Sequence, residues 1–494
     1  MSLKENVLSI RRFFHKIESI VERWFTDIHW INKVISFIPM PVKGKWSNLP
    51  KIFQDFLRNT SLALLITIFL HLFQAIPMVH EKEVKALDWV MAMNAGTEIG
   101  LGSSKDKVEH PYTFIDIDEK TYRDWDEPLF TPRDKILFLI KHAVNGGAKL
   151  IIVDIEMANA NKDNPVNDES LKQYLSSLAS IRNNQTKGII LVKSTRLAIN
   201  ENDIPEIRDS FLDEVVASSE IVHWASPMYD LDRDGVVRQW RILECASSRG
   251  GIEAFPSVQL LAHLLLAQDN KSHSNSKEAI NNEMKKASLN CKVGKESQLD
   301  GSGNFLTFGN LSFSLGSDEL NQRIMYSLNE EKRSPQIDIQ GKKQQVFSYI
   351  PAITVIAGEK RLLTTDYLKG HIVIIGGSYN DSNDIYSTPI GKMPGAMIIL
   401  NSVRTLLAYG TNHELPKWCK ILIETFVIIL LTIVFMYFRN IFAKFVAWFV
   451  IMLTLLPLSL YFFHSGIWIN FATPFFAVGL FALIDKRINT KQTV

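Results

Sequence analysis

Several aspartates stand where predicted buried strands end, and together they could build an acidic cleft. Asp116 and Asp118 end one apolar stretch, Asp154 ends a second at residues 150–153, and Asp384 follows a third. Sheets of α/β proteins usually bind ligands at the carboxyl ends of their strands. These carboxylates could therefore bind a cation or an amine. The alternative is structural, because aspartates at such positions also cap the helices that follow.

Glycines join the acidic residues in the third of these stretches. The apolar run at residues 372–375 predicts a fully buried strand, and Gly376, Gly377 and Ser378 follow it at once. Two glycines permit backbone angles that other residues resist, which predicts a sharp turn. Such a turn could bind an anion at a helix start, although no lysine follows it as in a phosphate loop.

The run Asp230, Asp232, Asp234 and Gly235 begins like a calcium-binding loop. Such a loop needs a bidentate glutamate at its twelfth position. That position is Arg241, whose positive charge would repel the ion. The run therefore predicts a tight turn, with Gly235 in the positive-φ region, rather than a metal site.

Arrangements typical of catalysis are missing from the sequence. It has no Gly-x-Ser-x-Gly elbow, no His-Glu-x-x-His pair and no kinase or cyclase signature. We therefore expect a protein that is not an enzyme and that uses no cofactor.

The three cysteines, Cys245, Cys291 and Cys419, include no Cys-x-x-Cys pair, which argues against a zinc site. Cys245 and Cys291 could form a disulfide if their domain lies outside the cytoplasm. Two free buried thiols are the simpler interpretation, and the one that we favour from the sequence.

Five features follow one another between Ile372 and Leu407. They are a glycine turn at Gly376, an acid at Asp384, Thr388-Pro389, Pro394-Gly395, and a helix that contains Asn401. In these features the chain resembles the second kind of CHASE domain (cyclases/histidine kinases associated sensory extracellular).

Three further stretches extend this resemblance over residues 85–415. They are the strands that end in Asp118 and Asp154 and the turn from Asp232 to Arg238. The family's Trp-Pro-Trp-Pro-Arg is reduced here to the four residues 130–133, which contain no tryptophan. The resemblance implies an extracytoplasmic sensory domain. The candidate ligand-binding residues are then Asp116, Asp118, Arg133, Asp154, Gly376, Gly377, Ser378 and Asp384.

Residues 80–415 predict an α/β domain with a mixed, largely parallel sheet. The stretches 112–118, 135–145 and 150–154 read as strand, helix and strand, which favours parallel pairing with a right-handed crossover. Residues 268–304 are rich in Asn, Ser, Lys and Gly, and they predict a long surface loop with a short helix near 277–287.

Four apolar segments predict transmembrane helices, at residues 59–79, 419–438, 445–463 and 467–484. About twenty apolar residues suffice to cross the hydrocarbon core of a bilayer. Lysine and arginine gather in residues 1–58, in the short loop 439–444 and in the tail 485–494. Because such residues concentrate on the cytoplasmic side, both termini should lie inside and the domain 80–415 outside.

Residues 2–38 predict one long amphipathic helix, with apolar residues at alternating spacings of four and three. Ile17, Val21, Trp24 and Ile28 lie in the middle of its apolar stripe. The stripe is wider than that of a simple zipper, which suits packing against a partner or a second copy. The alternatives are a helix that lies on the bilayer surface or one that folds back onto its own domain.

We therefore expect a multi-pass sensor or receptor subunit of a bacterial inner membrane. It would sense a ligand or partner outside and signal to a separate cytoplasmic effector, because the sequence ends about ten residues after the last predicted span. The alternatives are a structural subunit of an envelope complex and an extracytoplasmic hydrolase. Its partners would be the lipid bilayer, the effector or envelope protein, and a second copy of the chain. Nucleic acid is excluded because the basic start carries no stacking or groove-reading motif.

Overall fold

The computed structural model describes most of the predicted α/β domain. The described residues are 50, 77–94, 110–161, 164–178, 186–196, 204–248, 251–267, 276–289, 291, 305–308, 311–314, 322–329, 336–339, 342–358, 367–410, 418, 422–423, 426, 433, 449, 453 and 457–462. The predicted N-terminal helix, the four predicted spans and the tail 485–494 lie wholly or largely outside them. Among the described residues, no helix is long and apolar enough to cross a membrane.

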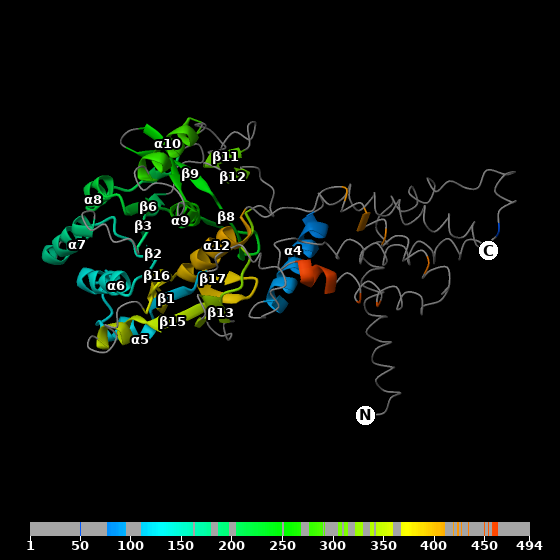
Figure 1. The fold of residues 1–494 in the computed structure, drawn as a ribbon, viewed down its shortest axis with the longest axis horizontal. Coiled ribbons are helices and arrows are strands. Elements are labelled where there is room, and N and C mark those ends of the chain that lie inside the picture. Colours follow the sequence, from blue (N-terminus) through cyan, green and yellow to red (C-terminus); the bar gives the residue numbers. More distant parts are fainter. Residues whose placement is uncertain are drawn as a thin grey trace, which may run out of the picture. The chain divides into compact units, whose positions relative to one another are not determined.

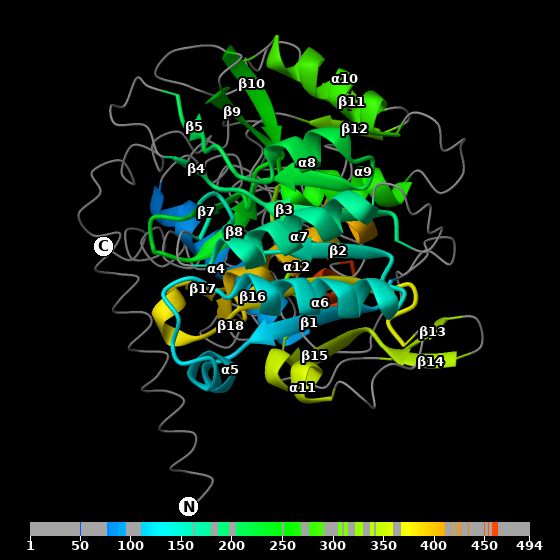
Figure 2. The same ribbon diagram turned by 90° about the vertical axis from the view of Figure 1, so that its left-hand side faces the viewer.

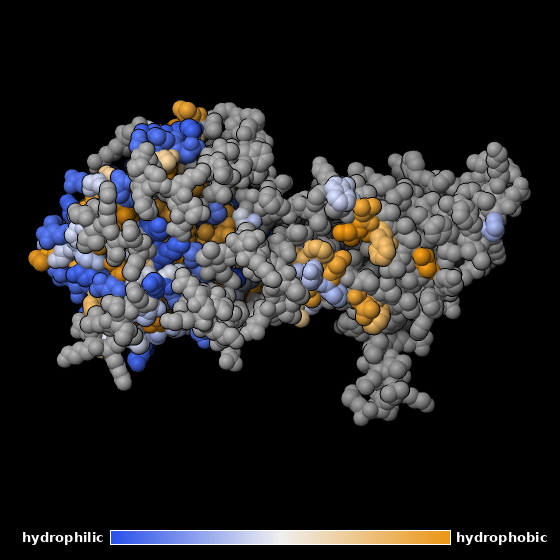
Figure 3. Space-filling view, viewed as in Figure 1, coloured by the Kyte–Doolittle hydropathy of each residue, from blue (hydrophilic) through white to orange (hydrophobic). Residues whose placement is uncertain are grey.

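The chain divides into two compact units. One consists of residues 1–90, 415–463 and 467–494 and includes most of helix α4 (Pro77–Asn94). The other consists of residues 91–414 and 464–466 and contains the α/β domain. The described face of this domain that Figure 3 shows is mainly hydrophilic, with single hydrophobic residues scattered across it.

The centre of the α/β domain is a six-stranded sheet in which every strand pairs in parallel with its neighbour (Figures 1 and 2). The strand order is β15-β1-β16-β2-β3-β6. Parallel sheets are covered on both faces, so their strands are mostly apolar, as the fully buried sequence Leu-Ile-Ile-Val of β2 illustrates. The bounds are β1 (Tyr112–Ile117), β2 (Leu150–Val153), β3 (Gly188–Val192), β6 (Val222–Ala225), β15 (Phe347–Pro351) and β16 (Ile372–Gly377).

Four helices cover one face of this sheet, as Figure 2 shows for α6 and α7. Ile140 of α6, Leu171 of α7 and Val355 of α11 share one buried core with Ile151 of β2 and Val373 of β16. The helices are α6 (Arg133–Asn145), α7 (Pro165–Leu178), α8 (Asp213–Ser218) and α11 (Ala352–Ala357). The short helix α5 (Glu119–Asp124) follows β1 at the carboxyl end of the sheet.

Two apolar helices cover the opposite face. α9 (Val258–Ala267) packs on β2 and β3, while α12 (Gly395–Tyr409) packs on β1 and β16 and against α9. Eleven of the fifteen residues of α12 are buried, so this helix is covered around most of its circumference. It is therefore a core element of the domain, as a helix apolar on nearly all sides must be.

Smaller sheets and helix α10 (Ser276–Ser288) complete the domain. The sheet β10-β9-β5-β4 consists of β10 (Gly251–Pro256), β9 (Leu243–Ser248), β5 (Glu206–Ile207) and β4 (Thr195–Arg196). Four two-stranded ribbons pair β7 (Tyr229–Leu231) with β8 (Val237–Trp240), β11 (Phe305–Phe308) with β12 (Leu311–Ser314), β13 (Gln336–Ile339) with β14 (Lys342–Gln345), and β17 (Ile385–Thr388) with β18 (Gly391–Pro394).

The predicted strands at 112–118, 150–154 and 372–375 are confirmed as β1, β2 and β16, but their arrangement was not predictable. β1 and β2 run parallel, as expected, yet they are not neighbours, because β16 lies between them. The segment between the glycines of β16 and α12, which contains Asp384 and Thr388-Pro389, forms the hairpin of β17 and β18. The short helix predicted within 268–304 is confirmed as α10, whose Ile280, Met284 and Ala287 are buried.

The prediction of two free thiols is wrong. Cys245 in β9 and Cys291, which follows α10, form a disulfide with their Cα atoms 5.7 Å apart. The bond ties the end of α10 to the four-stranded sheet. Spacing along the sequence could not reveal the pair, because 46 positions separate the two cysteines and the fold alone brings them together.

Candidate functional site

Two acidic residues and a glycine form a row across the carboxyl end of the central sheet. Asp116 of β1 is in register with Gly376 of β16. The backbone N–H of Asp154, which follows β2, donates to the carbonyl of Ile375 in β16 at 2.7 Å. Side chains alternate between the two faces of a strand. Since Ile375 and Val153 belong to the core under α6 and α7, this row faces the opposite helix, α12.

The first turn of α12 lies directly on this row. A Cβ atom on Gly376 would lie 2.7 Å from the Cβ of Ala396 and 3.5 Å from that of Asp154. A Cβ atom on Gly395 would lie 2.4 Å from one carboxylate oxygen of Asp384 and 2.6 Å from the other. Both glycines are therefore required by space. The sharp turn predicted at Gly376 and Gly377 is wrong, since both residues still belong to β16 and neither has a positive φ.

Asp154 and Asp384 form an interacting carboxyl pair beside α12. Burial raises the pKa of Asp384 to about 6. Burial also raises the pKa of Asp154 well above its ordinary value, and the negative charges of Asp384 and Glu156 raise it further. Two carboxylates that share a site cannot both ionise freely. The pair therefore retains a proton at a pH where isolated aspartates have lost theirs.

Two tyrosines complete the surroundings of the pair. Hydrogen bonds from Tyr386, Tyr229 and the backbone of Gly395 favour the ionised Asp384 and offset part of the effect of burial on its pKa. The rings of Tyr229 and Tyr386 meet edge to face, with centroids 5.2 Å apart. Burial, followed by the charge of Asp384, raises the pKa of the Tyr229 hydroxyl, so it remains a neutral donor.

Asp116 is fully buried and is engaged by its neighbours. Its carboxylate accepts hydrogen bonds from the hydroxyls of Tyr349, at 2.9 Å, and Ser378, at 2.5 Å. Ser378 is thus used within the protein. The helix that follows it, η2 (Asn380–Ser382), has only three residues, so the structure does not provide the predicted anion site at a helix start.

Asp118 has the structural role that the sequence left open. It is the N-cap of α5, and its carboxylate accepts hydrogen bonds from the backbone and the hydroxyl of Thr121, at 2.8 and 2.5 Å. The nearby Gly377 leaves room for an aromatic stack, because a Cβ there would lie 2.7 Å from the ring of Tyr379. That ring stacks on Tyr122 with centroids 4.1 Å apart.

The side chain of Arg133 makes its contacts away from Asp154 and Asp384. It is buried at the start of α6, where its guanidinium lies 3.5 Å from Asp168 of α7. It also donates to the backbone carbonyls of Glu156 and Asn159. Burial lowers the pKa of Arg133, partly offset by the charge of Asp168. Its contacts make it an anchor for the loop after β2.

The predicted tight turn at Asp232–Arg238 is confirmed, with Gly235 at a φ of 76°. Arg238 donates to Asp232 at 2.6 Å and to both carboxylate oxygens of Asp234 at 2.7 Å. The hydrogen bonds from Arg238 lower the pKa of Asp234 to about 2. An ionic clamp therefore holds this turn, and a bridge between Val236 and Ser387 joins it to β17.

The sequence therefore identified Asp154, Gly376 and Asp384 but missed Tyr229, Tyr386 and Gly395. A signal existed for Gly395, which stands in the recognised Pro-Gly pair. Tyr229 lies about 150 positions from Asp384 in the sequence, and no local pattern links them. Within the described part of the chain, no three His, Cys, Asp or Glu side chains are grouped so that they could hold a metal ion.

The fold and the site define an α/β domain whose polar groups gather where such sheets bind ligands. The sequence profile of the CHASE2 domain matches residues 62–437, which is more than half of the chain. The chain belongs to the CHASE2 domain family, whose members are extracellular sensory domains. No curated protein and no solved structure matches it.

Proposed function

We propose that this chain is an integral membrane sensor whose CHASE2 domain binds a small organic cation outside the cytoplasm. The site is the carboxyl pair Asp154 and Asp384, and helix α12 transmits its state toward the membrane. Membership of a family of extracellular sensory domains supports the sensory role. The positive-inside pattern of the sequence supports the four spans and the external position of residues 80–415.

The observation that carries this proposal is the position of the carboxyl pair against the first turn of α12. Because the pKa values of both aspartates are raised, the pair retains a proton when no positive charge lies beside it. An amine bound between them would supply the compensating charge and release that proton. Carboxylates form strong, charge-assisted hydrogen bonds with ammonium groups, and the rings of Tyr229 and Tyr386 add the aromatic faces that cations favour.

Transmission follows from the packing of α12. The Asp384 carboxylate lies directly against Gly395, so a ligand that moves it must also move the start of the helix. α12 ends at Tyr409, and the first of the three C-terminal predicted spans begins shortly afterwards in the sequence, at residue 419. A ligand changes such an equilibrium by its difference in affinity for the two positions of the helix.

The binding experiment uses the full chain in lipid nanodiscs, with putrescine and choline as probes of primary and quaternary amines. Calorimetry should show saturable binding with proton release, and Asp384→Asn should weaken it at least about tenfold. Asp134→Asn, at an exposed position on α6, is the matched control and should leave binding intact. If Asp384→Asn binds the probes as tightly as the wild type, the proposed site is wrong.

Topology is tested by fusing a reporter that is active only in the cytoplasm. It should work at residue 494 and fail near residue 300. The opposite pattern would exclude four spans with an external domain.

The output is tested at the N-terminal helix, which we propose docks a separate cytoplasmic protein. The double variant Ile17→Asp and Trp24→Asp places two charges in the predicted apolar stripe and should abolish recovery of that partner. Recovery of a stoichiometric envelope assembly instead of a kinase or cyclase would favour the structural alternative. Unchanged recovery would leave the helix as a bilayer-surface anchor.

A further inference from the structure

Two leucines stand out on the surface of the α/β domain. Leu129, in the loop 125–132 between α5 and α6, is 90% exposed, and Leu289, just after α10, is 85% exposed. Among the described residues these are the two most exposed large apolar side chains. Single apolar residues on a surface are ordinary, so the residues around each leucine decide whether it has a role.

The loop that carries Leu129 has an unusual backbone. Asp126 and Glu127 are consecutive residues with positive φ values, 61° and 48°, which residues other than glycine seldom adopt. The first residue of the loop, Trp125, packs against the buried core, and Phe130 is half exposed beside Leu129. Strained backbone persists only where the surrounding structure holds it, and it is concentrated at functional sites. The loop is therefore a preformed surface.

Acidic side chains surround this loop. Residues 118–127 hold five acidic and two basic side chains, a net charge of −3. Three of the acids, Asp124, Asp126 and Glu127, are exposed and lie within five positions of Leu129 in the sequence. The Leu129 loop therefore presents an apolar tip with a negatively charged rim.

The end of α10 has the opposite charge. Its last turn carries Lys285 and Lys286, both exposed, shortly before Leu289. Glu283 pairs with Lys286 at 2.5 Å, whereas no acid in the described part of the chain forms an ion pair with Lys285. This second surface is an apolar tip with a positively charged rim.

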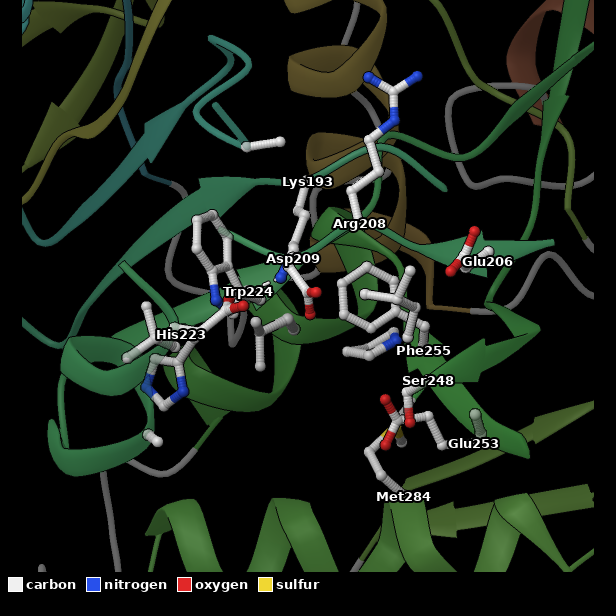
Figure 4. A pocket seen from close by; sticks show the side chains of 18 of the residues that line it. Lys193, Glu206, Arg208, Asp209, His223, Trp224, Ser248, Glu253, Phe255 and Met284 are labelled. Carbon is white, nitrogen blue, oxygen red and sulfur yellow. Dashed lines mark hydrogen bonds and ion pairs between the residues drawn. The ribbon is translucent and has the colours of Figure 1, made fainter. Parts of the chain in front are cut away.

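The inner face of α10 is already used within the domain. Met284 lines the cavity that Figure 4 shows, where Glu253 and Phe255 of β10 also lie. Lys277, near the start of the helix, donates to backbone carbonyls at the end of α8. The disulfide of Cys291 ties the other end of the helix to β9. The helix is thus fixed in place, and its exposed end can meet only another molecule.

The two charged tips lie at opposite ends of the domain (Figures 1 and 2). α5 and the Leu129 loop follow β1, which is next to the edge strand β15 of the central sheet. α10 packs on β10, which contacts β6 at the other edge. A single copy of the domain therefore cannot join its own two tips, but two copies can.

We propose that the Leu129 loop of one copy of this chain docks on the end of α10 of a second copy. Leu129 and Phe130 pack against Leu289, and the acidic rim faces Lys285 and Lys286. Two Leu129 loops would instead oppose acid to acid, so the contact joins unlike surfaces. Contacts of this head-to-tail kind generate rings or open rows of molecules. Because few apolar side chains take part, the contact belongs to the weak, transient class of interfaces.

The test uses the full chain in native membranes, with the photoreactive amino acid p-benzoylphenylalanine in place of Leu129. Illumination should give a covalent dimer, and mass spectrometry should locate the link within residues 285–289 of the second copy. Val166 on α7 is also apolar and is 70% exposed, so the same amino acid at Val166 is the matched control. It should give no link to residues 285–289.

Charge reversal tests the complementarity of the two surfaces. The double variant Lys285→Glu and Lys286→Glu should reduce the yield of the dimer at least about tenfold, because acid then opposes acid. Adding Asp124→Lys and Glu127→Lys to the same chain reverses both surfaces and should restore the dimer. Thermal unfolding of each variant checks that the domain is intact.

The proposal is overturned if Leu129 gives no link to residues 285–289, or if Val166 gives the same link. It is also overturned if the folded double variant keeps the yield of the wild type, or if the folded fourfold variant does not recover it. A link from Leu129 only to lipid or to a different protein would place another partner at the loop and exclude the second copy. The contact uses neither residue of the carboxyl pair, so these outcomes do not depend on amine binding.

Discussion

Removing the disulfide should destabilise the α/β domain strongly, because it closes a long loop. The perturbation is the double variant Cys245→Ser and Cys291→Ser. A cross-link lowers the entropy of the unfolded chain by an amount that grows with the logarithm of loop length. For the separation of 46 positions this relation gives about 4 kcal/mol at 25 °C.

The assay is thermal unfolding of the full chain, compared with Cys419→Ser, which removes the third cysteine and serves as the control. In a domain that spans residues 91–414, a loss of about 4 kcal/mol should lower Tm by roughly 6 °C, because the entropy of unfolding is about 2.1 cal/mol/K per residue. Reductant should lower the Tm of the wild type to that of the double variant and leave the double variant unchanged. A Tm within about 2 °C of the wild type would refute the reasoning.

The same bond reports on the compartment. Disulfides form and persist outside the cytoplasm, whereas cytosolic thiols are kept reduced. Rapid alkylation of intact cells should therefore leave Cys245 and Cys291 unmodified until a reductant is added. Alkylation of both without reductant would contradict the external location of residues 80–415.

Three further predictions concern α12 and its surroundings. Gly395→Ala places a methyl group against the Asp384 carboxylate and should lower the free energy of unfolding by about 1–3 kcal/mol, measured by denaturant titration. Asn401→Leu removes the side chain that bonds the backbone of residues 327 and 328, and should cost about 2–4 kcal/mol in the same titration. The folded pKa of Asp384, about 6, exceeds its unfolded value, so the stability it confers is complete below pH 3.8 and is lost as pH rises through 6. The wild type should therefore lose up to about 3 kcal/mol of its free energy of unfolding between pH 4 and 7, relative to Asp384→Asn. A difference between the two proteins that does not change with pH would contradict the raised pKa of Asp384.

Contiguous apolar runs made the central strands predictable. β1, β2 and β16 each consist mainly of apolar residues buried on both faces, a pattern that a short window of sequence can detect. The helical spacing after Pro394-Gly395 likewise predicted α12. Local patterns of this kind depend only on residues that are close in the sequence, and for that reason the predictions made from them were confirmed.

The arrangement of these strands depends on distant pairing, which no local pattern contains. β16 lies between β1 and β2 although it is more than 200 positions further along the chain. Its insertion separates Asp116 from Asp154 by two strand spacings, about 9–10 Å, instead of one. The sequence therefore placed the right carboxylates at the right edge of the sheet but grouped them too closely. Asp384, which comes with the β17 loop, is the partner of Asp154 instead.

The residues that the sequence assigned to ligand binding fall into two groups, which differ in the contacts that their side chains make within the protein. Asp118 and Arg133 have side chains whose hydrogen bonds are used by the helix and loop beside them. The charges of Asp154 and Asp384 instead interact, and the burial of the two carboxyl groups is unfavourable when both are ionised. We propose that a bound cation recovers the free energy that the repulsion between these two carboxylates costs.

A chain of contacts begins at Asn401 near the middle of α12 and ends at Gly395 at the start of the same helix. Asn401 holds the backbone of residues 327–328, and the neighbouring Ile324 donates to the carbonyl of Arg238 at 2.8 Å. The Arg238 turn bridges to Ser387 on β17, the strand that follows Asp384, whose carboxylate lies against the first residue of α12.

These contacts make a closed circuit of hydrogen bonds and packing around one helix. α12 is held both at Gly395, by Asp384, and at Asn401, by the backbone of residues 327–328. A shift at one of these positions therefore disturbs the contacts at the other. Packed interiors respond to such constraints by moving between discrete arrangements rather than by bending gradually. We therefore propose that a ligand at the carboxyl pair shifts the position of α12 as a whole. A helix displaced as one body would pass the binding event to the segment after Tyr409.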